Sequence, residues 1–258
     1  MKIAKAILFL ILLPFITIGQ SDPIQIEVDA IGNLYLLYSD KIEKRDSQGQ
    51  LLFSNSYNQY GEMNQLDITN ALQPFVYFKT TNKILYLDNT MSVQSSVLDL
   101  YQLPLELGNA YITQVCGARN GGIWCFDNAQ KKIYRLDKWG GLIFEIPNLT
   151  SYSPLASWNV LWMRESQNTL FLRDEKFLHV FDFTGAFIDS RIMTYHPTAA
   201  QGKTLWECRD HTLWYIYPTE MKISSVGNIN TPFCIQNGKC FSLDFLPTGK
   251  DIKEFVNK

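Results

Sequence analysis

Short apolar segments recur in pairs along the chain, and a tight polar turn joins the two members of each pair. The first apolar residues of the second segments, Leu34, Ile84, Ile123, Leu170 and Leu213, are 50, 39, 47 and 43 residues apart. Repeats of about 40–50 residues that consist of short strands are typical of the blades of a β-propeller. The five pairs are Ile24 to Asp29 with Asn33 to Tyr38, Phe75 to Lys79 with Lys83 to Leu87, Ile112 to Cys116 with Ile123 to Phe126, Val160 to Arg164 with Thr169 to Leu172, and Thr204 to Cys208 with Thr212 to Tyr217.

Three of the copies continue with a third apolar segment, an aspartate, and a glycine three residues after it. These turns run from Asp46 to Gly49, from Asp137 to Gly140 and from Asp182 to Gly185, and a fourth segment follows each of them. An aspartate side chain can hold such a turn by local hydrogen bonds, and glycine adopts backbone angles that other residues resist. We therefore expect each blade to be a sheet of four antiparallel strands.

Some segments are apolar on both faces instead of alternating, for example Leu34 to Tyr38 and Leu213 to Tyr217. Strands of this kind are buried on both sides, as the inner strands of neighbouring blades are. The fold class is therefore all-β, a β-propeller. A sixth pair, Phe233 to Gln236 with Lys239 to Leu243, comes only 27 residues after the fifth. This spacing favours five blades plus a C-terminal hairpin, with six blades as the alternative.

The first 19 residues have the pattern of a secretory signal peptide. Lys2 and Lys5 precede an apolar run from Ala6 to Ile18, and small and polar residues follow from Gly19. The alternative is a membrane anchor, but 13 apolar residues are fewer than the roughly 20 that cross a bilayer. We expect cleavage near Gly19, a single propeller domain over residues 20–258 without a transmembrane segment, and location in the periplasm, with secretion from the cell as the alternative.

The charge of the chain argues against one class of partner. Without Lys2 and Lys5 the formal net charge of −2 becomes −4, and the chain contains no basic cluster. Binding to nucleic acid requires clustered Lys and Arg, because these side chains neutralise phosphates. We therefore expect no nucleic-acid partner.

Export makes disulfides possible, since they persist outside the cytoplasm. If Asn120-Gly121 is a two-residue hairpin loop, Cys116 lies directly opposite Cys125. Cys234 and Cys240 lie opposite each other if the loop between them has three residues, Gln236 to Gly238. Both pairs are candidate disulfides, with reduced thiols in a blade core as the alternative, and Cys208 is expected to be a free, buried thiol.

The segment Ile24 to Phe53, which reads IQIEVDAIGNLYLLYSDKIEKRDSQGQLLF, resembles one repeat of the NHL-type propellers. This resemblance implies a fold and, as an expectation, a platform for protein or peptide recognition, with hydrolases and lyases as a minority. The leader and the composition rich in Tyr, Asn, Ile and Lys resemble exported proteins of the Bacteroidota. In that group a small propeller is similar in kind to the plug subunit of the type 9 secretion translocon.

Motifs for catalysis or for a cofactor are absent from the sequence. The three histidines, His179, His196 and His211, do not have the spacing of metal ligands, and no G-x-S-x-G motif is present. Carboxylate pairs such as Glu165 with Asp174, or Asp244 with Asp251, could act as acid and base, although such pairs are common on protein surfaces. We expect no catalytic residue, no metal and no cofactor.

Three long connections carry the residues most suited to an interface. They contain Tyr57, Tyr60, Met63, Tyr101 and Tyr152, and aromatic residues and Met are enriched in protein interfaces. The alternative is that these side chains cap the blade ends. Our hypothesis is a non-enzymatic protein that binds another envelope or outer-membrane protein and is a monomer outside its complex. An exported hydrolase or lyase that acts on glycan or peptide at the central channel is the alternative, and divergence between the copies argues against a lectin.

Overall fold

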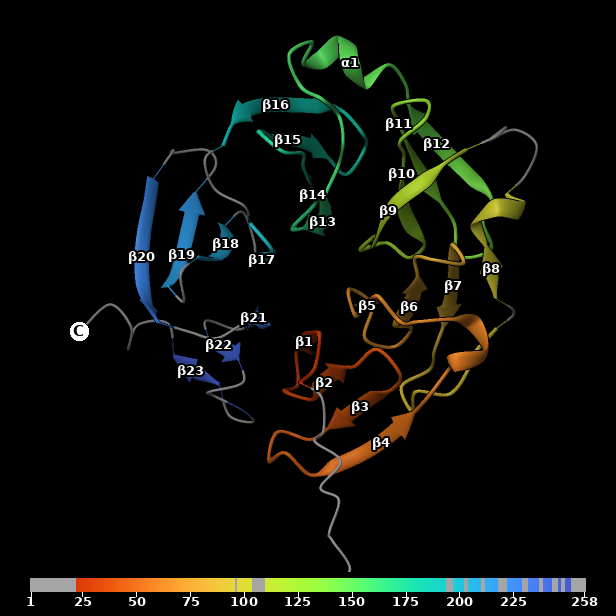
Figure 1. Cartoon of the computed structure of the whole chain (residues 1–258), viewed down its shortest axis with the longest axis vertical. Helices are drawn as coiled ribbons and strands as arrows, with labels where there is room; N and C mark the ends of the chain where they lie inside the picture. Colours follow the sequence, from red (N-terminus) through yellow and green to blue (C-terminus); the bar gives the residue numbers. More distant parts are fainter. Residues whose placement is uncertain are drawn as a thin grey trace, which may run out of the picture.

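The computed structural model describes residues 22–95, 97–103, 110–193, 197–201, 204–209, 212–217, 222–228, 232–236, 239–242, 246 and 249–251. Within these ranges, antiparallel sheets surround a central axis, and each sheet forms one sector of a ring (Figure 1). The prediction of an all-β propeller is confirmed. The predicted signal peptide, residues 1–19, lies outside the described residues.

Five of the sheets have four strands, in the order in which they follow along the chain. The first sheet contains β1 (Gln25–Val28), β2 (Leu34–Leu37), β3 (Ile42–Arg45) and β4 (Leu51–Asn55). The second contains β5 (Gln65–Asp67), β6 (Phe75–Phe78), β7 (Lys83–Tyr86) and β8 (Leu98–Asp99). The third contains β9 (Ile112–Gly117), β10 (Ile123–Asp127), β11 (Lys132–Leu136) and β12 (Leu142–Ile146). The fourth contains β13 (Trp162–Ser166), β14 (Thr169–Arg173), β15 (Phe177–Asp182) and β16 (Phe187–Ile192). The fifth contains β17 (Ala199–Gln201), β18 (Thr204–Arg209), β19 (Thr212–Tyr217) and β20 (Lys222–Asn228).

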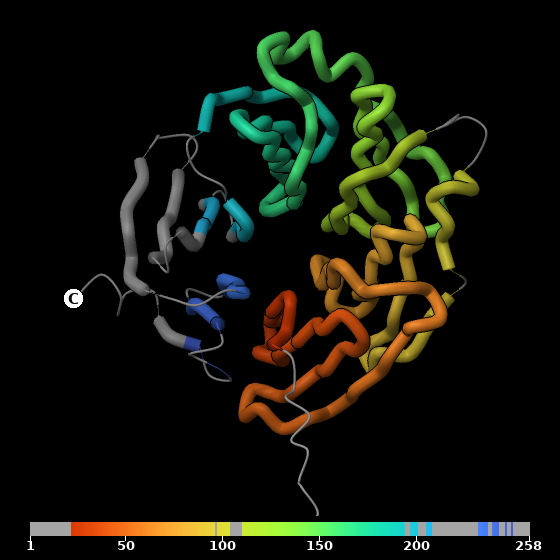
Figure 2. Tube along the Cα trace, viewed as in Figure 1, coloured from red at the N-terminus to blue at the C-terminus, as the bar shows by residue number. Residues whose placement is uncertain are grey.

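The C-terminal hairpin forms a sheet of its own. Strands β21 (Phe233–Gln236) and β22 (Lys239–Ser242) are joined by β23 (Lys250–Asp251). This three-stranded sheet lies in the sector between the fifth and the first sheet (Figure 2), and β21 contacts both β17 and β1. The hairpin thus closes the ring of sheets.

Helical segments are short in the described residues. They are two 3₁₀ helices, η1 (Asn58–Tyr60) and η2 (Leu100–Gln102), and one turn of α-helix, α1 (Leu149–Tyr152). In the part of the chain described, no helix is long and apolar enough to cross a membrane.

One turn type recurs five times and explains where the strands reverse. In each copy an aspartate, at position 29, 46, 88, 137 or 182, accepts hydrogen bonds from the backbone N–H groups two and four residues later. The third residue after the aspartate has a positive φ, which favours glycine. Four copies have glycine there, and the fifth has Met91 with φ 62°.

The hydrophobic core is divided into layers between neighbouring sheets. Tyr35 and Val76 belong to the layer between the first and second sheets, and Trp124 and Leu170 belong to the layer between the third and fourth. The first sheet also packs against the C-terminal sheet, because Ile26 and Leu34 share a layer with Phe241. The second strands β2, β6 and β10 are therefore buried on both faces, as the apolar sequence from Leu34 predicts.

The predicted pairing of Cys116 with Cys125 is wrong. The turn from Ala118 to Gly122 has three residues between its ends, so Cys116 lies opposite Trp124, and Cys125 lies opposite Val115. Side chains one position apart in register point to opposite faces of a sheet. Cys116 accordingly lies in the layer toward the fourth sheet, and Cys125 lies in the layer toward the second.

The predicted pairing of Cys234 with Cys240 is wrong for the opposite reason. Gln236 pairs with Lys239, so the loop has two residues instead of three. Cys234 therefore lies opposite Phe241, and Cys240 lies opposite Ile235. Cys208 lies in β18, and its side chain is outside the described residues.

Candidate functional site

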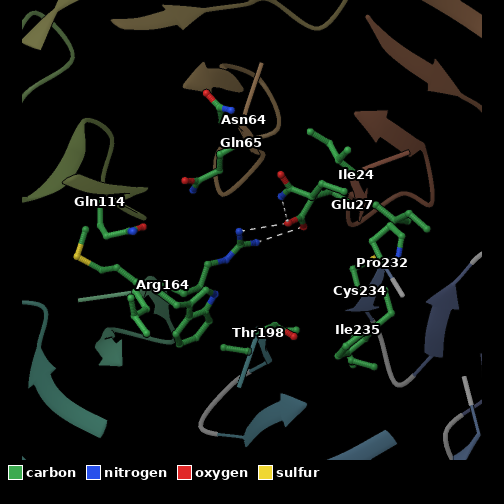
Figure 3. Close-up of a pocket in the computed structure, with 18 residues that line it drawn as sticks. Ile24, Glu27, Asn64, Gln65, Gln114, Arg164, Thr198, Pro232, Cys234 and Ile235 are labelled. Atoms are coloured by element: carbon green, nitrogen blue, oxygen red, sulfur yellow. Dashed lines mark hydrogen bonds and ion pairs between the residues drawn. The ribbon is translucent and has the colours of Figure 1, made fainter. Parts of the chain in front are cut away.

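A cavity of about 430 Å³ opens on the axis of the ring (Figure 3). Its lining residues belong to the first strand of every sheet or come directly before that strand. They are Ile24 to Glu27, Asn64, Gln65, Gln114, Leu161 to Arg164, Thr198 to Ala200, and Pro232 to Ile235. The six sheets thus contribute to one common site.

The topology gives the ring two distinct ends. The five aspartate turns lie at one end, which we call the turn end, and the connections between successive sheets lie at the other, which we call the loop end. All first strands run from the loop end toward the turn end. The cavity is lined by the beginnings of these strands, so it is the mouth of the central channel at the loop end.

Two layers of side chains extend across this mouth. The upper layer contains Gln25, Gln65, Gln114 and Trp162, one from each of the first four sheets. Two residues further along the same strands are Glu27, Asp67, Cys116 and Arg164, which form the lower layer. A separation of two residues places the side chains of a strand on the same face. Of the lower layer, Glu27 and Arg164 line the cavity, whereas Asp67 and Cys116 are buried between sheets.

The lower layer is held by an ion pair across the axis. The Arg164 guanidinium donates to both oxygens of Glu27, at 3.3 Å each, and lies 3.9 Å from the Asp67 carboxylate. The Glu27 charge raises the pKa of Arg164 further above its ordinary value. Because β1 and β13 belong to the first and fourth sheets, this pair connects opposite sides of the ring.

Asp67 is also committed to backbone groups. Its carboxylate accepts from the N–H of Gly117 at 2.8 Å and from the N–H of Thr69 at 2.8 Å. A Cβ atom on Gly117 would lie 2.5 Å from Asp67 Oδ1, so this approach requires glycine. The beginning of the second sheet is thereby hydrogen-bonded to the third.

In the upper layer, glutamine side chains recognise the main chain of the next sheet. The Gln25 amide donates to the Leu66 carbonyl at 2.7 Å and accepts from the Leu66 N–H at 2.9 Å. The Gln65 amide donates to the Val115 carbonyl at 3.2 Å. The fourth sheet has Trp162 instead of a glutamine at this position of its first strand. Gln114, in the third sheet, has no hydrogen-bond partner within the described residues.

The structure separates the five predicted interface residues. Tyr57 and Met63 are buried in the layer between the first and second sheets, where the Tyr57 hydroxyl donates to the Met91 carbonyl. Tyr60 packs at the edge of the same layer, against Phe78. The prediction that Tyr57 and Met63 lie on the surface is wrong, because the connection from β4 to β5 folds inward. Tyr101 and Tyr152 are exposed.

The connections at the loop end carry exposed apolar side chains, and two of these side chains reach the channel mouth. Ile24 and Leu161 line the cavity itself, and Leu155 is 86% exposed. Tyr101, Tyr111 and Tyr152 are also exposed, and Tyr152 is stacked on Phe187 in the outer strand of the fourth sheet. The turn end has exposed apolar side chains as well, namely Ile31, Leu72, Trp139 and Phe183, and Leu72 is 77% exposed.

Glu165 and Asp174 do not form a catalytic pair. Glu165 accepts from the Trp124 indole N–H at 2.6 Å, whereas Asp174 accepts from the backbone N–H groups of Lys176 and Phe177. Although burial acts to raise the pKa of Asp174, these N–H groups lower it overall. Asp244 and the side chain of Asp251 are outside the described residues.

His179 is a core residue. Its ring is stacked on Trp158 with 3.8 Å between the centroids, and burial lowers its pKa to about 4. The described residues contain no group of three or more His, Cys, Asp and Glu that could hold a metal ion. His196 and His211 are not among the residues described.

Comparison with known proteins gives a result for the fold. No protein-family model matches the chain, and no curated protein matches its sequence. Among solved structures, a streptogramin B lyase is 18% identical, with a TM-score of 0.56 over 87% of this chain and 76% of that one. PorZ of Porphyromonas gingivalis, described as an essential surface component of the type-IX secretion system, is 10% identical, with a TM-score of 0.51 over 85% of this chain and 35% of its own. A Bacteroides caccae protein of unknown function is 12% identical, with a TM-score of 0.51 over 75% of this chain and 77% of its own. At these identities the similarities show that the chain has the fold of a β-propeller.

Proposed function

We propose that this protein is a non-enzymatic, exported β-propeller that binds another protein of the cell envelope through its loop end. The observation that carries the proposal is the exposure of apolar side chains on the connections at the loop end, two of which line the channel mouth. Tyr, Leu and Ile side chains with this exposure supply contact area when a protein covers them. Connections between rigid elements are also where binding residues are usually located.

The chemistry of the channel supports binding over catalysis. The two carboxylates of the lower layer, Glu27 and Asp67, are both committed to Arg164 or to backbone N–H groups. A general acid or base must be free to exchange a proton with a substrate. A hydrolase or lyase at this site would have to break the ion pair first, so it is the weaker of the two hypotheses.

We propose further that the partner is a component of the type 9 secretion translocon. The leader and the composition of the chain resemble those of exported proteins of the Bacteroidota. PorZ, which has a similar fold, is described as a component of that secretion system.

The location is tested by fractionation of the native cell. We expect a mature form that starts after Gly19 in the periplasmic fraction. Mass spectrometry of the N-terminal peptide identifies the cleavage site. Intact Met1 in the membrane fraction would contradict export with cleavage.

The partner is tested by affinity purification of the mature protein from native envelopes in mild detergent. We expect one envelope protein in stoichiometric amount with the wild type. Leu155→Asp places a charge at the loop end and should abolish this capture. Leu72→Asp is the matched control, because it changes an equally exposed leucine at the turn end and should have no effect. Equal capture by both variants, or turnover of peptides or glycans by the wild type, would contradict the proposal.

A further inference from the structure

We propose that the channel mouth binds the main chain of an extended, uncharged peptide segment. This inference rests on the proposed function, since the segment would belong to the envelope partner. It names what the cavity recognises and which residue recognises it. The glutamine series of the upper layer, the charge of the site and the strand edges that surround it support this proposal.

Two glutamines of the upper layer already form hydrogen bonds to main-chain groups of the next sheet. The Gln25 side-chain amide takes both main-chain groups of Leu66, one as donor and one as acceptor. A strand partner would make the same two bonds, because a carboxamide has one face with a donor and an acceptor. Gln65 repeats part of this contact at Val115. Glutamines in this layer thus recognise backbone.

The third glutamine of the upper layer, Gln114, does not form such a contact. By the same rule its partner would lie in the fourth sheet, next to Trp162. Trp162 cannot continue the series, and the Gln114 amide is left without a hydrogen bond among the described residues, with its side chain directed into the cavity (Figure 3). A donor and an acceptor are therefore available there for a ligand.

The charged side chains at the channel mouth are already paired with each other. Arg164 is paired with Glu27 and lies 3.9 Å from Asp67, whose carboxylate also accepts from backbone N–H groups, so each of these charges already has a partner. The other polar side chains that line the cavity, Asn64, Gln65, Gln114 and Thr198, are uncharged. Placing a charged group there would remove water from it without a free counter-charge, which is costly. The site therefore favours an uncharged ligand, and the apolar rim of Ile24, Leu161 and Trp162 favours one with apolar side chains.

The backbone around the cavity consists of strand edges. Each of the six lining strands is the edge strand of its sheet, nearest the axis. Edge strands have main-chain N–H and C=O groups that can pair with an added extended chain. A cavity of about 430 Å³ is within the range of small-ligand sites. A peptide main chain fits these groups better than a sugar does, because its donors and acceptors alternate in the same way.

The test uses the mature protein and a pool of blocked hexapeptides without charged residues, acetylated at the N-terminus and amidated at the C-terminus. Titration calorimetry measures their affinity. We expect binding by the wild type, a loss of at least tenfold with Gln114→Ala, and a similar loss when the peptide amides are N-methylated. Gln48→Ala is the matched control, because Gln48 is an exposed glutamine at the turn end. The affinity of this variant for the peptides should equal that of the wild type.

The outcomes separate this inference from the proposed function. Absence of peptide binding by the wild type, equal binding by Gln114→Ala, or binding of glycans in place of peptides would overturn the inference. If Gln114→Ala still captures the envelope partner while no peptide binds, only the inference fails. If peptides bind as expected but no partner is captured, only the proposed function fails. Equal unfolding midpoints of Gln114→Ala and the wild type exclude misfolding as the cause.

Discussion

At the scale of single residues, the polar groups inside this propeller are mainly structural. Glu27 and Arg164 hold opposite sheets, Asp67 holds two neighbouring sheets, and Glu165 accepts from the Trp124 indole. Glu165 and Asp174 are a possible acid–base pair from the sequence, but in the structure each carboxylate accepts hydrogen bonds from its own N–H donors. Position along the chain does not show which carboxylates already have partners.

Substitution of Glu27 tests the ion pair of the lower layer. Glu27→Gln leaves the Arg164 guanidinium without its main counter-charge in a site where both side chains are largely buried. Loss of one partner of a buried pair costs about 3–5 kcal/mol, and partial exposure reduces this to roughly 2–3 kcal/mol. Urea unfolding of the mature protein measures the free energy of unfolding.

Glu145→Gln is the control for that measurement. Glu145 pairs with Lys132 at 3.2 Å, but both side chains are substantially exposed. Exposed pairs contribute about 0–1 kcal/mol, so this variant should unfold almost as the wild type does. Equal losses in the two variants would show that the pair across the channel has no special role.

His179 predicts a pH dependence of stability. Its pKa is about 4 in the folded protein, lowered by burial, and near 6.5 when the chain is unfolded. The unfolded state therefore takes up the proton first as the pH falls, so stability is complete above pH 6.5 and decreases toward pH 4. At 1.36 kcal/mol per pKa unit the total is about 3 kcal/mol.

Two variants assign this pH dependence. His179→Phe retains a ring that can stack on Trp158 and should show a flatter profile of unfolding free energy between pH 7 and pH 4.5. Ser190→Ala removes the hydroxyl 2.9 Å from His179 Nδ1 but keeps the histidine, so its profile should stay steep. The stability that Asp174 contributes is lost at lower pH, because its pKa is below the ordinary value. A steep profile in His179→Phe would contradict the assignment.

At the scale of elements, the aspartate turn is the unit that sets strand register. Asp46→Ala removes the acceptor for the N–H groups of Gln48 and Gln50 in an exposed turn. Hydrogen bonds of this kind contribute about 1 kcal/mol each, so we expect a loss of roughly 1–2 kcal/mol in thermal or urea unfolding. Asp46→Asn keeps an acceptor oxygen and should lose less. An unchanged midpoint in Asp46→Ala would show that the turn forms without its side chain.

The same turn explains the error in the cysteine register. Ala118 to Gly122 has the same backbone hydrogen bonds as the aspartate turns, with Gly121 at φ 83° in the position of the turn glycine. The sequence Ala-Arg-Asn-Gly-Gly matches the pattern Asp-x-x-Gly-x except at its first residue. Comparison with the three recognised turns would have predicted the correct register, whereas the Asn-Gly pair alone favoured a two-residue loop.

The corrected register predicts two free thiols in the third sheet. Cys116 and Cys125 lie on opposite faces, and burial raises the pKa of both thiols well above the ordinary value. Thiolate is the reactive form, so neither should react with iodoacetamide in the folded protein. Both should react in denaturant without a reducing agent, as mass spectrometry of the tryptic peptides will show. A disulfide-linked pair of peptides would contradict the register.

At the scale of the whole molecule, the sequence predicted the architecture better than the site. Repeats with a period of 40–50 residues and strands apolar on both faces were sufficient for an all-β propeller. The channel site was missed, although a signal was present, because Gln25, Gln65 and Gln114 each precede an aliphatic residue in the first strand of a repeat. The inward fold of the connection that carries Tyr57 and Met63 depends on packing between sheets, which no local pattern shows.

Closure of the ring gives a prediction for truncation. The C-terminal sheet contacts the first and fifth sheets, and Phe241 shares a core layer with Ile26 and Leu34. A chain that ends before residue 232 would expose this layer, so we expect it to lose cooperative unfolding. Phe241→Ala keeps the ring and should cost about 3 kcal/mol, the lower limit for a buried phenylalanine. Cooperative unfolding of the truncated chain would show that five sheets are sufficient.

The ion pair across the channel has a consequence for the rate at which the protein unfolds. Glu27 and Arg164 are 137 residues apart in the chain, so they meet only after the intervening sheets have assembled. Contacts of such long range form late in folding, because the entropy of closing the intervening chain must be overcome first. A contact that is absent from the transition state slows unfolding and leaves the folding rate almost unchanged. We therefore expect the pair to slow unfolding and so to extend the lifetime of the folded ring.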